Sequence, residues 1–145
     1  MNDKIIGLYF GIDNDDFEYL LQYFAKEGYH YHVPHCECHG ENTILPGDYY
    51  HFHLDVKQLR ELSQECIWAM TLQVYPLECP TDRFDTYEGF LQSSCIYCVI
   101  MYDCGWVEIY AKSVEELFKL ETFLSKINTE NLHYVSTPPE SFIRD

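Results

Sequence analysis

Histidine and cysteine side chains are concentrated in one short part of this chain. Six of its seven histidines lie between residues 30 and 53, in the segment HYHVPHCECHGENTILPGDYYHFH, together with two of its seven cysteines. Imidazole and thiolate are the ligands that zinc and similar metals prefer in proteins. This segment is therefore the part of the chain whose residue types are best suited to metal binding or other chemistry.

Two His-x-His pairs at the ends of this segment predict a metal site. Side chains two residues apart on an extended strand project from the same face. If the strands around the two pairs form a hairpin, four imidazoles converge on one surface and could bind zinc: His30, His32, His51 and His53. The loop of that hairpin would hold Cys36, Cys38 and His39 as a second set of ligands, although Cys-x-Cys lacks the usual two-residue spacer.

The same alternation is also explained by a half-buried sheet without any cofactor. The histidines would then face water, and the residues that alternate with them would face the core: Tyr29, Tyr31, Val33, Tyr50, Phe52 and Leu54. A pH-sensing cluster is a third interpretation, because imidazole titrates near neutrality. The sequence leaves these alternatives open.

The composition predicts one globular domain over residues 1–145. Hydrophobic residues make up 47% of the chain and aromatic residues 17%, with 13 tyrosines. The start of the chain lacks a basic and apolar leader, and no later stretch approaches the roughly 20 apolar residues of a membrane span. We therefore expect a cytoplasmic protein whose seven cysteines are reduced thiols.

The charge is strongly acidic, with 24 Asp and Glu against nine Lys and Arg, a formal net charge of −15. Such a surface repels phosphates and anionic lipids, so neither nucleic acid nor a membrane is an expected partner. It attracts basic proteins. No phosphate-binding glycine loop, GxSxG or HExxH motif occurs, so the sequence favours a binding protein over an enzyme.

Two helices are predicted by their apolar stripes and start signals. Residues 15–27 hold Phe17, Leu20, Leu21 and Phe24 on one side. Residues 114–127 form a second helix, which Ser113 and Glu116 would open as a capping box. Shorter helices are expected over residues 56–62 and 86–92.

Alternating and apolar runs predict the strands. The clearest are CIYCVIMYD and WVEIYAK, joined around Asp103-Cys104-Gly105 as a hairpin requires. Further strands are expected at residues 4–12, 66–75 and 132–136, and a C-terminal tail at 138–145. The predicted fold is α+β, a mostly antiparallel sheet with helices packed on one face. Cys95 and Cys98 have the spacing of a redox or metal pair, but residues three apart on a strand point to opposite faces, which favours a packing role.

Two stretches, TYEGFLQSSC at 86–95 and YDCGWVEIYAK at 102–112, resemble an uncharacterised family of small bacterial proteins. The resemblance is looser over residues 68–76 and faint in the histidine-rich segment. The family is known only as a domain of unknown function. The resemblance therefore implies a compact bacterial α+β protein and no particular activity.

Two functional hypotheses follow. The first is an acidic protein-binding protein, such as an immunity protein, an antitoxin or an inhibitor of a basic partner, since tyrosine and tryptophan are favoured at interface hot spots. The second is a zinc-binding protein or metal-dependent enzyme that uses the histidine-rich strands of residues 30–53.

Overall fold

The structure is a computed structural model that describes residues 4–38, 52–103 and 105–142. Its strands are β1 (Gly7–Ile12), β2 (Tyr29–Cys38), β3 (Phe52–Leu54), β4 (Ile67–Pro76), β5 (Tyr97–Tyr102), β6 (Trp106–Ala111) and β7 (Thr129–Val135). Its helices are α1 (Asn14–Phe24), α2 (Val56–Leu62), α3 (Tyr87–Gln92) and α4 (Val114–Leu124).

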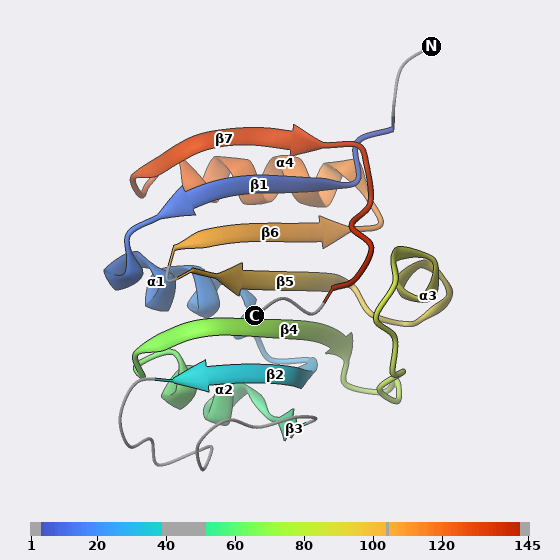
Figure 1. Cartoon of the computed structure of the whole chain (residues 1–145). Helices are drawn as coiled ribbons and strands as arrows, with labels where there is room; N and C mark the ends of the chain where they lie inside the picture. The colour runs from blue at the N-terminus through green and yellow to red at the C-terminus, as the bar shows by residue number, and fades with distance from the viewer. Residues whose placement is uncertain (1–3, 39–51, 104, 143–145) are drawn as a thin grey trace.

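The strands of the described residues form one seven-stranded sheet in the order β3-β2-β4-β5-β6-β1-β7 (Figure 1). Every neighbouring pair is antiparallel. The predicted antiparallel α+β fold is therefore confirmed, as is the hairpin of β5 and β6. The predicted strands and helices differ from the observed ones mainly at their ends, by up to three residues, except that β2 continues five residues beyond the predicted end at Val33.

One face of the sheet carries the larger buried cluster, to which α1, α2 and α4 contribute. The stripe predicted for α1 is buried there, and β4, β5 and β6 add every second residue. The strand residues of this first face include Met70, Leu72, Val74, Val99, Met101, Val107 and Ile109. Alternation along the strands thus sends one apolar set toward these helices.

The opposite, second face carries a smaller buried cluster covered by chain segments of a different kind. It contains Ile6, Tyr75, Phe90, Cys95, Cys98, Ile100, Tyr110 and Phe142. Phe90 comes from α3, so a description with all helices on one face is too simple. In Figure 1 the C-terminal segment crosses the front of the sheet, while α4 lies behind it.

The C-terminal segment is packed, whereas the sequence predicts a tail from residue 138. Phe142 is completely buried, and its ring stacks on that of Tyr110 with centroids 5.0 Å apart. Its backbone N–H donates to the carbonyl of Asp85 at 2.9 Å, and its carbonyl accepts from the Thr71 hydroxyl at 2.9 Å. One large apolar side chain thus fastens this segment to the second face.

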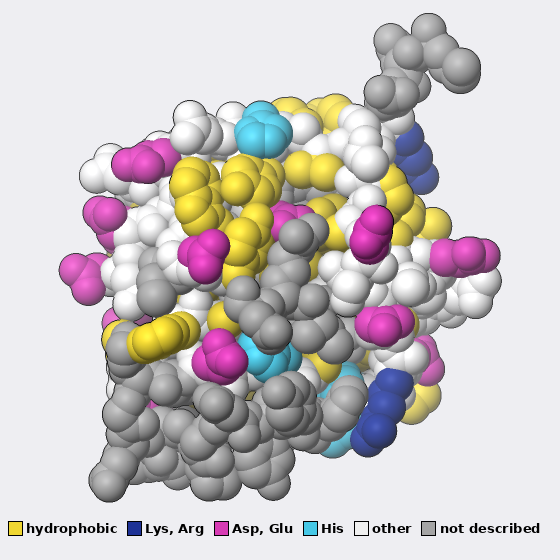
Figure 2. Space-filling model, viewed as in Figure 1, with side chains coloured by type: hydrophobic (Ala, Val, Ile, Leu, Met, Phe, Trp, Pro, Cys, Tyr) yellow, Lys and Arg dark blue, Asp and Glu magenta, His cyan; other side chains and the backbone are white. Residues whose placement is uncertain are grey.

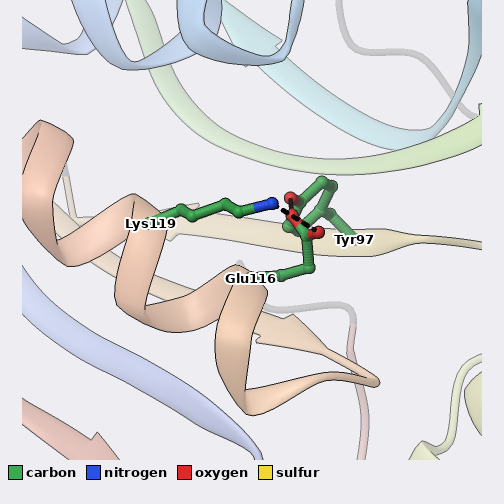
Figure 3. A network of polar contacts seen from close by, with 3 residues as sticks. All are labelled: Tyr97, Glu116 and Lys119. Atoms are coloured by element: carbon green, nitrogen blue, oxygen red, sulfur yellow. Dashed lines mark hydrogen bonds and ion pairs between the residues drawn. The ribbon is translucent and has the colours of Figure 1, made fainter.

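The predicted capping box of α4 is not formed among the described residues. The Ser113 side chain makes no cap hydrogen bond there, and the Glu116 carboxylate instead accepts from the Tyr97 hydroxyl of β5 (Figure 3). Lys119 lies 3.5 Å from the same carboxylate. Burial, and then the bond to Glu116, raise the pKa of Tyr97. Glu116 therefore ties α4 to the sheet and does not cap the helix.

Candidate functional site

The histidines of β2 lie on the second face of the sheet. His30 is paired with Tyr75 and His32 with Gln73, both on β4. Tyr31, between them, is buried on the first face, as predicted. His32, however, is only 1% exposed. The expectation that all these histidines face water is wrong for His32, because the second face is covered as well.

The predicted metal ligands are brought together only in part. His32 and His53 are paired in register on β2 and β3, and their rings stack with centroids 5.2 Å apart. His30 turns away, because its Nε2–H donates to the carbonyl of Cys79 at 2.6 Å. His51 and His39 lie outside the described residues. Within the described part of the chain, no group of three or more His, Cys, Asp or Glu could hold a metal, and the zinc site stays a prediction.

Cys36 and Cys38 lie on β2 and not in the predicted loop, because the strand continues through Pro34. The pairing with β4 shifts between His32 and His35, and such a bulge accommodates a proline within a sheet. Cys36 is fully buried in the cluster of the first face. The structure thus separates it from the histidines of the second face, while the side chain of Cys38 is not described.

A buried polar network joins β2 and β4 to the segment that covers them. The Nδ1–H of His32 donates to Oε1 of Gln73 at 2.9 Å. The Gln73 amide donates to the carbonyl of Phe84 at 3.4 Å. The Tyr75 hydroxyl lies 3.0 Å from the same Oε1 and 2.6 Å from the carbonyl of Asp82. Burial raises the pKa of Tyr75, so its hydroxyl remains a donor at neutral pH.

The other half of the second face, over β5, β6, β1 and β7, carries an aromatic surface formed by Tyr9, Tyr102, Trp106 and His133. The Tyr9 ring stacks on Trp106 with centroids 5.6 Å apart and lies 5.0 Å from the His133 ring. Tyr102 is the cross-strand partner of Trp106. These side chains are half-buried, apart from the exposed His133. Figure 2 shows hydrophobic side chains gathered over β1 and β6, acidic ones around them, and Lys or Arg only toward the edge of the view.

A buried carboxylate lies beneath this aromatic surface. Glu108 on β6 is 4% exposed and is the cross-strand partner of Tyr9. It accepts a hydrogen bond from the Tyr110 hydroxyl. Burial, and then hydrogen bonds with Tyr9 and Glu108, raise the pKa of Tyr102. These contacts hold Tyr9 and Tyr102 in place through their hydroxyl groups, and both side chains remain half-buried at the surface, whereas Tyr110 is fully buried.

A cavity of about 220 Å³ opens beside the aromatic surface, where β1 ends and β6 and β7 begin. Trp106, Asp13, Asn128 and Glu130 line it. A Cβ added to Gly11 would lie 3.0 Å from the indole ring of Trp106. Glycine at this position therefore lets the indole lie close against the backbone of β1.

The buried cysteines of the second face are unsuited to nucleophilic chemistry. Cys95 and Cys98 both belong to its buried cluster, because Cys95 precedes β5 and does not follow the strand alternation. Burial raises the pKa of Cys95 to about 12 and raises that of Cys98 as well. Since the thiolate is the nucleophile, these protonated thiols act as packing groups.

Comparison with known protein families gives one match. The family described as "Protein of unknown function (DUF2691)" matches residues 5–141. The chain belongs to this family. The match includes both stretches that resemble an uncharacterised family and extends over the aromatic surface and the cavity, so these features lie inside the family domain. The description of the family names no activity.

Comparison with curated proteins and with solved structures gave no match. No helix in the described ranges is long and apolar enough to cross a membrane.

Proposed function

We propose that the protein is a small binding protein for a basic protein partner, of the immunity-protein, antitoxin or inhibitor type. The aromatic surface is the observation that carries the proposal. Tyrosine and tryptophan supply much of the binding energy at protein interfaces, since they bury large area at a small cost in side-chain entropy. Here they are pre-positioned by stacking and by hydrogen bonds to their hydroxyls.

The charge of the chain favours a basic partner. The formal net charge is −15, and exposed acids lie close to the aromatic surface in sequence and in the sheet: Asp13, Asp103 and Glu130. Surfaces of opposite charge raise the rate of encounter and discourage wrong partners. A cytoplasmic location fits the same proposal, because the described cysteines are all free thiols.

Binding to an isolated basic partner tests this proposal. Protein from the native host that is retained on the immobilised chain at low salt should be basic. The purified pair should then associate more slowly as the Debye length falls from roughly 30 Å to 3 Å. Tyr9→Ala should weaken the complex by about 30-fold, which corresponds to a hot-spot loss of about 2 kcal/mol.

Tyr19→Ala is the matched control, because Tyr19 is a tyrosine that reaches the surface from α1, away from the aromatic surface. Its affinity should stay close to that of the unmodified chain. Retention of neutral proteins alone, with affinity independent of salt, would count against the proposal. An equal loss in both variants would place the interface elsewhere.

A further inference from the structure

We propose that the cavity beside Trp106 is a binding site for one arginine side chain of the basic partner. This inference rests on the proposed function, and it names the type of partner side chain that the protein would bind. Three properties of the cavity support it: an aromatic wall, carboxylates without a neighbouring cation in the lining, and a size that suits a planar cationic group.

The aromatic wall is Trp106. Its indole is held beside Tyr9, with an interplanar angle of 20°, and against the backbone of Gly11. Tryptophan is the best aromatic partner for a cation, and a guanidinium group also stacks on it by its flat face. Because the ring is already fixed by its neighbours, little side-chain entropy is lost when a ligand binds.

The charged residues that line the described cavity are both acids. Asp13 and Glu130 are exposed carboxylates, and the amide of Asn128 adds a further acceptor. Asp13 precedes α1, yet its side chain makes no cap hydrogen bond within the described chain. A guanidinium group presents five N–H donors and pairs with carboxylates in a bidentate manner.

The N-terminus of α1 carries a positive partial charge, which by itself would disfavour a cation nearby. Asp15 and Asp16 in the first turn of the helix oppose that charge. The local field in the cavity therefore remains that of its carboxylates.

Other ligands fit less well. The cavity of about 220 Å³ is far larger than a single metal ion, and no group of three or more His, Cys, Asp or Glu in the described residues could hold one. Anions would be repelled by the two lining carboxylates. A lysine ammonium is compact and strongly hydrated, and it lacks the flat face that stacks on an indole.

The probe is N-acetyl-arginine amide, compared with N-acetyl-citrulline amide, which has nearly the same shape without the charge. The chain has two tryptophans, so a Trp68→Phe background leaves Trp106 as the only indole fluorophore. We expect a saturable change in fluorescence with the arginine probe that weakens with salt, a smaller change with N-acetyl-lysine amide, and none with the citrulline probe.

Glu130→Gln in this background should weaken binding of the arginine probe about tenfold, the equivalent of about 1.4 kcal/mol. Glu115→Gln is the matched control, because Glu115 is an equally exposed acid on α4, which follows the other end of β6. It should leave binding unchanged. Absence of saturation, an equal response to the citrulline probe, or equal losses in both variants would overturn the site.

The failures of this site and of the proposed function are distinguishable. A basic partner whose salt-dependent binding is unaffected by Glu130→Gln would overturn the arginine site and support the proposed function. Saturable arginine binding by a chain that associates with no basic protein would support the site and overturn the proposed function.

Discussion

The first face of the sheet is covered by helices, whereas the covered part of the second face lies mainly under irregular chain, and the side chains beneath the two covers differ accordingly. Helices satisfy most of their own backbone hydrogen bonds, so the face under α1, α2 and α4 is mainly apolar. Polar contacts there include those of the Tyr31 and Tyr97 hydroxyls, which donate to α1 and α4. Irregular segments present carbonyls that must find donors. On the second face these donors are side chains of β4. Thr71 donates to the carbonyl of Phe142, Gln73 to the carbonyl of Phe84, and Tyr75 to the carbonyl of Asp82.

The second face is itself divided. Over β2, β4 and β5 it is closed by α3, by the segment before it and by Phe142. Over β1 and β6 the aromatic side chains remain half-exposed. We infer that the closed half contributes to stability and that the open half is the surface for recognition.

Leu72→Ala tests the first face and should have the largest effect on stability. Leu72 is completely buried under the helices, and truncation of such a side chain lowers the free energy of unfolding by about 2–5 kcal/mol. Chemical denaturation measures this change. Leu77→Ala serves as the control, because Leu77 is 64% exposed, and it should cost within about 0.5 kcal/mol. A loss below about 1 kcal/mol for Leu72→Ala would contradict the assignment of the first face as the main core.

Gln73→Leu tests the second face, where a more apolar residue should be harmful. The change removes the acceptor of the His32 Nδ1–H and the donor to the Phe84 carbonyl. Loss of a partner by a buried polar group costs about 1–3 kcal/mol, and we expect a loss in that range. Hydrogen exchange should also become faster in residues 77–86, which this network holds.

The control for this variant is Gln22→Leu, because Gln22 is exposed on α1 and its side-chain amide donates to the nearby Glu18. Its free energy of unfolding should change within about 0.5 kcal/mol. If Gln73→Leu is instead neutral or stabilising, the polar side chains of β4 are not required by the segments that cover them.

Local patterns were sufficient to predict most elements of the fold. The stripe of α1 and the hairpin of β5 and β6 depend on residues close together in sequence, and both are confirmed. The capping box of α4 was predicted on the same basis and is wrong. Glu116 has a partner 19 residues away in Tyr97, and a local pattern cannot reveal such competition. A capping box does form in the described residues at the start of α2, between the N-cap Asp55 and Gln58.

The burial of His32 could not be predicted for a related reason. Its partner Gln73 is 41 residues away, and the cover over this face includes Phe142, whose carbonyl binds a side chain 71 residues distant. The aromatic surface was missed because its members come from different strands. The signal that could have found it is on β6, where Trp106, Glu108 and Tyr110 alternate with the apolar residues of the first face.

The smallest expected effect concerns Cys95, because the raised pKa of its thiol reflects the exclusion of water from the closed half of the second face. Burial raises that pKa from its usual 9.0 to about 12. Between these values the unfolded chain loses the thiol proton while the folded chain keeps it, so the unfolded state binds fewer protons. The contribution of Cys95 to stability is therefore complete below about pH 9 and is lost as the pH rises toward 12, at about 1.4 kcal/mol per pH unit.

Cys95→Ala should remove this part of the alkaline loss, so its free energy of unfolding should fall less steeply from pH 9 to 11 than that of the unmodified chain, a window bounded by the usual and the raised pKa. Denaturant unfolding at a series of pH values under reducing conditions measures the slope. Cys66→Ala is the control, because Cys66 is exposed and should leave the slope unchanged. Tyrosines that ionise in the same range affect both variants equally, so the comparison isolates the thiol. Equal slopes in the two variants would mean that water reaches Cys95 in the folded protein, and that the closed half of the second face is more open than its hydrogen bonds imply.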